Sequence, residues 1–475
     1  MTCRALAPLA LLLSAPAFAQ PANDGPDPAA LVDAQYDRTA RVARQIWDWA
    51  ELGYMEDRSS GLLQAELAKE GFAVRKGVAE IPTAFIAEWG SGGPVIAVLA
   101  EFDALPGISQ SDSPVREEDD KRAAHACGHN LFGAGSLTAA IAIKQWLEAT
   151  GTPGRVRLYG TPAEEGGSGK VYLVRAGLFD DVDFALHWHA DDENSAAAQT
   201  SLANRSAKFR FRGQSAHAAA APEMGRSALD GVEAMNMMAN MMREHTGMDA
   251  RMHYVITEGG SAPNVVPDFA EVFYYVRHSE TPEVEAIWAR LEDAARGAAL
   301  GTGTKVDWEI IHGNNPLLVN EALARMMDAK LRQVGGVRYT ADERAFAEEL
   351  AKSLGDTAEP LASAAEIQPY EKSLGYGSTD VGDVSWATPT VGVRTATWVP
   401  GTASHSWQSA AASGTTIGFK GAQVAAKSMA LAAAELFTNP ELRAAAKAEF
   451  DASRGPGYEY RSLLGDRAPP LDYRR

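Results

Sequence analysis

The stretch Val95-Ile96-Ala97-Val98-Leu99-Ala100 runs directly into Glu101-Phe102-Asp103. Six consecutive apolar residues of this kind are typical of a strand that is buried on both faces of a sheet. In open α/β sheets, ligand sites form at the carboxyl ends of the strands. The two acidic residues therefore stand where we expect a site, and we expect Asp103 to support it. The pattern of strands and helices around this stretch indicates the α/β fold class.

Two further segments carry side chains that bind metals. His125-Ala126-Cys127-Gly128-His129-Asn130 precedes a helix expected over residues 131–148. Thiol and imidazole groups are ligands of divalent transition metals. Alternate side chains of an extended segment point the same way, so Cys127 and His129 can face one ion. For His125 two roles stay open, as a ligand or as a group that orients a ligand.

The second segment, Pro162-Ala163-Glu164-Glu165-Gly166-Gly167, follows a strand expected over residues 156–159. The side chains of two adjacent glutamates must diverge, which suits a division of labour. One carboxylate can bind metal while the other takes a proton from water, whose pKa a metal lowers. An exposed acidic turn is the alternative, and the glycine pair at the end of a buried strand disfavours it.

Two more histidine positions are candidates for the metal site. His187 and His189 lie on either side of Trp188, in a strand expected over residues 184–188. Either can be a ligand, and we favour His189 because it lies at the end of the strand. His405, in Ser404-His405-Ser406-Trp407, is a candidate that spacing alone does not decide. Four other histidines are assigned to surface or packing roles: His245, His253, His278 and His312.

A different pattern fills residues 203–314. The expected elements are a strand, a helix, two strands, a helix and a strand, at 206–212, 226–244, 252–257, 269–277, 281–298 and 305–311. This is the β-α-β-β-α-β order of ferredoxin-like domains. We therefore expect an inserted domain, with a catalytic domain in two parts over residues 31–202 and 315–440 and a tail over 441–475. The first inserted helix carries five methionines, which suit core or subunit packing: Met235, Met237, Met238, Met241 and Met242.

The N-terminal residues have the features of a signal peptide. A basic start, Met1-Thr2-Cys3-Arg4, leads into the apolar run 5–15 and then Ala17-Phe18-Ala19, an A-x-A cleavage site. We expect residues 1–19 to be removed and the protein to be periplasmic or secreted. Residues 21–30 are expected to form a flexible leader. Cleavage leaves Cys127 as the only cysteine, so the mature chain has no intrachain disulfide.

The charge of the chain restricts its partners. The formal net charge is −18 and becomes −19 when Arg4 is removed with the signal peptide. Such a balance argues against nucleic acid and anionic membranes as partners. After the signal peptide, the sequence has no apolar run long enough to cross a bilayer.

These motifs together resemble a known family. Ala100–Pro106, His125–His129 and Pro162–Gly166, with the C-terminal motifs Gly377–Val384 and Pro400–Trp407, are similar to the dinuclear metallopeptidases that act as aminoacylases, hippurate hydrolases and auxin-conjugate amidohydrolases. The likeness extends from about residue 35 to residue 440. It implies a mixed central sheet flanked by helices, with the inserted ferredoxin-like domain as a lid that also forms a homodimer. Glu101 departs from the family, which has Asp or His at this position.

The resemblance also implies roles for single residues. Five residues match the family's ligands for two divalent ions, zinc or manganese: Cys127, His129, Glu165, His189 and His405. Glu164 matches the general base, and His217, in Gly213–Ala218, matches the lid histidine that reaches the partner subunit's site and stabilises the oxyanion. Asn264 and Arg277 match positions that bind the substrate's carboxylate, a role to which the planar guanidinium of arginine is suited.

The function expected from the resemblance is hydrolysis of an N-acyl or N-aroyl amino acid to a carboxylic acid and a free amino acid. A dipeptidase, a carboxypeptidase or a deacetylase of the same family is the first alternative. An exported metal-binding or ligand-binding protein without turnover is the second. Trp188, Trp386, Trp398 and Trp407 could line an acyl pocket or belong to the core. The sequence leaves open whether a second type of subunit is needed.

Overall fold

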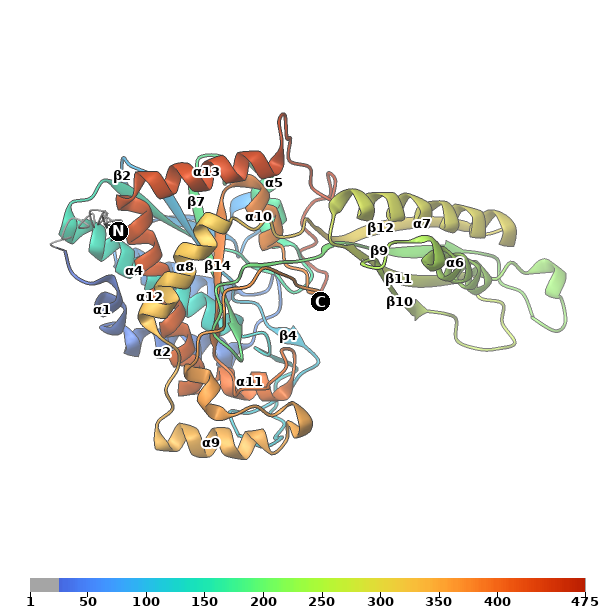
Figure 1. The fold of residues 1–475 in the computed structure, drawn as a ribbon. Helices are drawn as coiled ribbons and strands as arrows, with labels where there is room; N and C mark the ends of the chain where they lie inside the picture. Colours follow the sequence, from blue (N-terminus) through green and yellow to red (C-terminus); the bar gives the residue numbers. More distant parts are fainter. Residues whose placement is uncertain (1–24, 475) are drawn as a thin grey trace, which may run out of the picture.

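The computed structural model describes residues 25–474. The predicted signal peptide, residues 1–19, lies outside the described residues. Figure 1 shows a body of helices around one sheet, from which a smaller unit of strands and two helices projects to one side. Within the described part of the chain, no helix is both long and apolar enough to span a membrane.

The sheet of the body has six strands in the order β1-β2-β6-β3-β7-β14. Strands β6, β3, β7 and β14 are parallel to one another, whereas β2 runs antiparallel to both of its neighbours, β1 and β6. This arrangement confirms the predicted mixed sheet. The strands are β1 (Ala73–Lys76), β2 (Phe85–Ser91), β3 (Val95–Ala100), β6 (Gly154–Gly160), β7 (Phe184–Asp191) and β14 (Thr390–Ala396).

Strand β3 is buried on both faces, as its composition predicts. Ile96, Val98 and Ala100 belong to a large core on one face, and the alternate residues 95, 97 and 99 belong to a second core on the other. The large core lies under α2 (Tyr36–Trp49), α3 (Asp57–Lys69), α4 (His129–Thr150), α8 (Glu321–Val334) and α12 (Thr416–Thr438). The second core lies under the short helices α5 (Gly169–Arg175) and α10 (Val381–Ala387).

The start of the described chain differs from the expected flexible leader. Helix α1 (Pro28–Asp33) begins there, with the Asp27 side chain accepting a hydrogen bond from the Ala29 N–H as its N-cap. Val32 of this helix is fully buried in the large core. The remaining elements of the body are short or peripheral: β4 (Leu105–Pro106), β5 (Ala123–Ala124), β8 (Gln199–Thr200), α9 (Ala341–Ala351), β13 (Ser373–Leu374) and α11 (Trp407–Ser413).

The projecting unit, called the lid below, has four antiparallel strands in the order β10-β11-β9-β12 with α6 and α7 packed on one face. Its chain order is β9 (Ala203–Arg212), α6 (Ala228–Met242), β10 (Arg251–Glu258), β11 (Phe269–His278), α7 (Thr281–Thr302) and β12 (Lys305–Asn314). Met235 and Met242 of α6 belong to the lid core. Met237, Met238 and Met241 are exposed.

A tail is expected over residues 441–475, but residues 441–474 are packed against the body. Helix α13 (Pro440–Arg454) begins with Asn439 as N-cap and Pro440 at its first position. Beyond it, residues 455–474 run back across the body as an irregular strap. Leu463 and Leu464 of the strap are buried. The cause is tertiary packing, which a charged, proline-containing sequence does not indicate.

Candidate metal centre and active site

Cys127 and His129 lie at the N-terminal end of helix α4, close to the carboxyl end of β7. Gly128 between them has φ +78°, and a Cβ on it would lie 2.4 Å from the Ala190 side chain. Glycine thus allows the loop to pass close to β7. In consequence, Cys127 Sγ lies 3.5 Å from Nε2 of His189, the residue near the carboxyl end of that strand.

Asp103 connects this loop to the glutamate pair. One carboxylate oxygen lies 3.0 Å from His129 Nδ1, and the other accepts the Glu165 N–H at 2.9 Å. Burial opposes ionisation of Asp103, but the neighbouring His129 lowers the pKa of this carboxyl below its usual range. A carboxylate that orients a histidine in this way is the usual outer partner of a metal-binding imidazole. Asp103 therefore links the His129 ring to the backbone of Glu165.

The glutamate pair lies in a tightly bent loop after β6. Ala163 and Ser168 have left-handed backbone angles, with φ +57° and +61°, and Gly166 has φ +103°. Left-handed angles are strained for residues with a side chain and persist only where neighbouring structure holds them. Here the buried Glu56 carboxylate accepts the Ala163 N–H at 2.9 Å, and the Tyr54 hydroxyl donates to the Gly167 carbonyl at 2.5 Å.

His405 comes to the same place from the C-terminal part of the body. It too has a left-handed backbone, with φ +60°, and its N–H donates to the Ala126 carbonyl at 2.9 Å. Its Nε2 lies 3.4 Å from Glu165 Oε1, while half of its side chain, 51%, is exposed. The donors are thus buried on one side and open to solvent on the other, as a site for a small substrate requires.

Three overlapping groups of donor atoms result, each within 4.8 Å: Cys127 with His129 and His189, Cys127 with Glu165 and His405, and His129 with Glu164 and Glu165. Two of the buried atoms, His129 Nε2 and Glu165 Oε1, form no hydrogen bond among the described residues, although Glu101 Oε2 lies 3.1 Å from the first and His405 Nε2 lies 3.4 Å from the second. Buried polar atoms without partners cost free energy unless an ion or water satisfies them. The donor set, one thiol with imidazoles and carboxylates, fits zinc or manganese.

The pKa values of His189 and Glu164 are shifted in opposite directions by their surroundings. Burial, with the nearby Arg394, lowers the pKa of His189 to about 3, so this imidazole is neutral and its lone pair is free to bind metal. Burial and the neighbouring carboxylates of Glu101 and Glu165 raise the pKa of Glu164 well above its usual value. A carboxyl with a raised pKa accepts a proton more readily, which suits a general base.

No motif in the sequence indicates a role for Lys170, a buried lysine near Glu164. Lys170 is fully buried and its Nζ lies 2.6 Å from Glu101 Oε1 and 2.7 Å from Asp380 Oδ1. Glu101, Glu164 and Asp380 form a fourth group of close carboxylates, and the Lys170 ammonium pairs with two of them, Glu101 and Asp380. Glu101, the residue at which the sequence departs from the family, is therefore paired with the ammonium group of Lys170.

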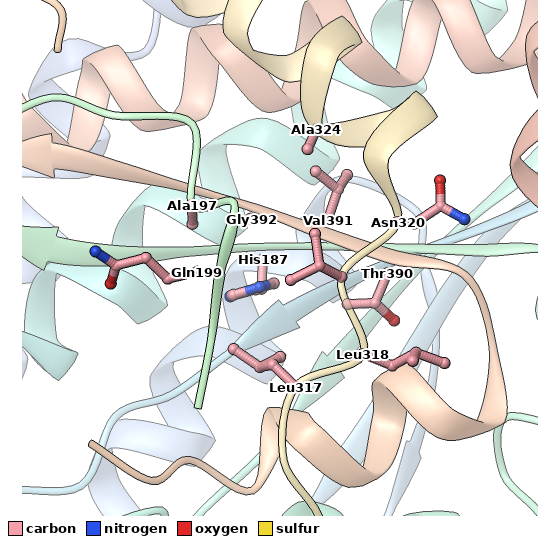
Figure 2. Close-up of a pocket in the computed structure, with 11 residues that line it drawn as sticks. His187, Ala197, Gln199, Leu317, Leu318, Asn320, Ala324, Thr390, Val391 and Gly392 are labelled. Atoms are coloured by element: carbon pink, nitrogen blue, oxygen red, sulfur yellow. The ribbon is translucent and has the colours of Figure 1, made fainter. Parts of the chain in front are cut away.

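His187 and His125 lie outside the donor groups. Figure 2 shows His187 in a small cavity beside Leu317, Leu318, Thr390 and Gly392. His125 Nε2 is 3.1 Å from the Ile46 carbonyl on helix α2. The choice of His189 over His187 agrees with this geometry, and His125 stands apart from the cluster.

The lid residues singled out in the sequence are divided between its two ends. His217 and Asn264 are exposed on neighbouring loops, where the Ala218 N–H donates to the Asn264 carbonyl at 3.0 Å. These loops leave the ends of β9 and β10 that point away from the body (Figure 1). Arg277 instead pairs in register with Asn204, at the end of the sheet that joins the body. The chain thus does not bring His217 and Asn264 to its own metal cluster.

No carboxylate among the described residues forms an ion pair with Arg277. Its guanidinium lies 5.5 Å from the Tyr275 ring, and its buried Nε has no hydrogen-bond partner among the described residues. Burial lowers the pKa of Arg277 below its usual value. Among the tryptophans, Trp188 and Trp398 are core residues, with 0% and 1% of their surface exposed.

Most of the chain is similar to known hydrolases. Residues 97–409 match peptidase family M20/M25/M40. The B subunit of the p-aminobenzoyl-glutamate hydrolase of Escherichia coli (strain K12) is 39% identical over 86% of this chain and 91% of its own. This protein belongs to the M20/M25/M40 peptidase family. The predicted family is thereby confirmed.

Two more relatives support the assignment at different distances. The Xaa-Arg dipeptidase of Mus musculus is 34% identical over 58% of this M20 chain and 64% of its own. A solved Bacillus subtilis structure, described as a dinuclear metal binding peptidase from the M20 family, has a TM-score of 0.58 at 18% identity. It covers 86% of this chain and 99% of that one, and it supports the fold.

Proposed function

We propose that this protein is a metal-dependent amidohydrolase that cleaves N-acyl or N-aroyl amino acids to a carboxylic acid and a free amino acid. One observation carries the proposal. Cys127, His129, Glu165, His189 and His405 converge from four separate segments of the chain on one half-open site, with Glu164 beside them. The donor atoms suffice for two neighbouring divalent ions, zinc or manganese, with Cys127 common to two groups.

The chemistry follows from the positions of the side chains. Ions bound here would polarise the amide carbonyl and lower the pKa of a water molecule. Glu164 takes the proton from the attacking water and delivers it to the leaving nitrogen. Asp103 keeps His129 and the Glu165 backbone in place through both steps. Arg277, half-buried at the junction of lid and body and without a counter-charge among the described residues, binds the carboxylate of the amino acid.

The proposal includes a homodimer formed through the lid. Strand β10 is an edge strand, and Tyr254 and Ile256 on it are exposed next to Met237 and Met241 of α6. An apolar edge of this kind is a template for pairing with a second copy. In such a dimer, His217 and Asn264 would enter the partner's site, where His217 stabilises the oxyanion. This accounts for two polar residues that have no role in their own chain's site.

Export and substrate choice complete the proposal. The N-terminal sequence directs the protein to the periplasm or the outside medium, and the substrate is a small acyl amino acid or dipeptide. The Escherichia coli relative is named for p-aminobenzoyl-glutamate hydrolysis and the mouse relative for Xaa-Arg dipeptide hydrolysis. Both activities cleave an amide next to an amino acid with a free carboxylate. Since the Escherichia coli hydrolase has A and B subunits, both similar to this chain, the test also asks whether a second type of subunit is needed.

The test is amino-acid release by the purified protein from a panel of N-acyl amino acids, N-aroyl amino acids and dipeptides, with and without chelator. We expect release from at least one member, loss on chelation and recovery with manganese or zinc. Release that survives complete metal removal would contradict the proposal. If metal binds but no member is cleaved, adding back a copurifying partner subunit decides between a missing subunit and a protein that binds without turnover.

A further inference from the structure

The strap, residues 455–474, ends against the catalytic loop that carries Glu164 and Glu165. An Arg474 guanidinium nitrogen donates to the Glu165 carbonyl at 2.5 Å. The Tyr473 hydroxyl lies 3.4 Å from the same oxygen, and its ring packs edge-on against Tyr54 with 5.6 Å between centroids. Tyr54 in turn holds the Gly167 carbonyl. The strap therefore meets the loop at the metal-binding residue itself.

Both polar backbone groups of Glu165 are thus occupied. Its N–H donates to Asp103, and its carbonyl accepts from Arg474. The loop around it contains three left-handed residues, Ala163, Gly166 and Ser168, within six positions. Such a conformation needs support from outside the loop. Asp103 and Glu56 support its N–H groups, and the strap supplies the charged donor on the carbonyl side.

The packing around the strap leaves little freedom for this contact. A Cβ on Gly53 would lie 2.4 Å from the Tyr473 hydroxyl and 2.9 Å from the Ala163 side chain. Farther back, Arg467 donates to the Ile311 carbonyl of lid strand β12 at 2.9 Å, and the Tyr172 hydroxyl donates to the Ala468 carbonyl at 3.2 Å. The strap is therefore anchored before it reaches the loop.

We propose that Arg474, assisted by Tyr473, is a positioning residue that fixes the Glu165 peptide and so aims the Glu165 carboxylate at the metal site. Arg474 touches neither the metal donors' side chains nor, in this role, the substrate. The inference rests on the proposed role of Glu165 as a metal ligand. Loss of a residue that orients a ligand typically weakens metal binding by about 10- to 100-fold.

The experiment compares the full-length protein with Arg474→Met, Arg474→Lys and Asp472→Asn. Asp472 is exposed, lies in the same segment and is the matched control. Manganese and zinc affinities are measured by competition with a chromogenic chelator, together with kcat and KM for the best substrate. We expect Arg474→Met to weaken metal binding by about tenfold or more and to lower kcat at sub-saturating metal, with KM unchanged. Arg474→Lys should recover part of the loss, and Asp472→Asn should behave as the unmodified chain.

The outcomes separate this inference from the proposed function. If the unmodified protein binds neither metal, the proposed function fails. If it binds metal and Arg474→Met binds equally tightly, the positioning role alone is overturned. An increase in KM without a change in metal affinity would also overturn it, because Arg474 would then be a substrate contact. A lower thermal stability of the metal-free protein with unchanged metal affinity would mean that the strap is merely structural.

Discussion

Asp103 Oδ1 lies 3.0 Å from His129 Nδ1, while the other ring nitrogen, Nε2, lies 3.1 Å from Glu101 Oε2. Asp103→Asn removes the charge that holds this ring and weakens the contact with the Glu165 N–H. We expect metal affinity to fall by about 10- to 100-fold. Chelator competition measures the change. Asp112→Asn, at an exposed carboxylate paired with Arg44, serves as the control and should leave the affinity as it is.

Glu164→Gln tests the general base. The amide keeps the size of the side chain but cannot take a proton, so we expect kcat to fall by about 10²- to 10⁴-fold. Metal content, measured on the purified variant, should stay the same because Glu165 and the other donors are intact. Turnover close to that of the unmodified enzyme would assign the base to another group.

The proposed action of His217 in the partner subunit's site can be tested by mixing two inactive variants. His217→Ala and Glu164→Gln should each be nearly inactive alone. If the lid acts on the partner's site, a mixed dimer contains one site with both residues intact. Half of the dimers in an equal mixture are mixed, so about a quarter of the full activity should return after subunit exchange. No recovery, in a sample shown by native mass spectrometry to contain mixed dimers, would place His217 outside the partner's site.

Lys170→Met should destabilise the protein, because it leaves Glu101 and Asp380 buried without their cation. Removal of one partner from a buried ion pair typically costs about 3–5 kcal/mol. Denaturant unfolding of the metal-free protein gives the value. The double variant Lys170→Met/Asp380→Asn should recover part of this loss, since it removes one of the two uncompensated charges. Equal stability of single variant and parent would show that the triad carries no net stabilisation.

His187 makes the stability depend on pH in a predictable direction. Burial, with the nearby His189, lowers the pKa of His187 to about 3, whereas an unfolded histidine titrates near 6.5. Between these two values the unfolded chain binds a proton that the folded chain does not, so stability falls as the pH drops below about 6.5. At pH 5 this single histidine accounts for about 2 kcal/mol of lost unfolding free energy. His187→Leu, measured without metal at pH 8 and pH 5, should lose about that much less than the parent.

Much of the fold follows from local sequence patterns. The apolar run 95–100 and the acids after it indicate a buried strand and a site at its end, and the six elements of the lid follow their predicted order. Asn439 and Pro440 are residues typical of the start of a helix, although the sequence predicts a tail over residues 441–475. The strap that follows has no such signal, because its position depends on contacts with residues hundreds of positions away.

The candidate site likewise contains some residues that local sequence patterns predict and others that they do not. Cys127, His129 and the glutamate pair are found from short spacings, which local geometry makes informative. Lys170 could not be found in this way, since its partners Glu101 and Asp380 are distant in the sequence and a lone lysine on a short helix usually faces water. His405 stood as an open candidate for a similar reason: only the fold shows that its loop returns beside Ala126.

The pairing of the first and last lid strands has a consequence for how the chain folds. Strands β7 and β14 are adjacent in the body, yet about 200 residues of chain separate them, a costly loop to close. Asn204 of β9 and Asn314 of β12 stand opposite each other in the lid sheet. A lid that folds first therefore brings the ends of its own insertion together and shortens the effective loop to about half its length. In this order of events, the lid would speed the assembly of the body as well as cover its site, and the loop carrying His405 would reach the metal cluster last.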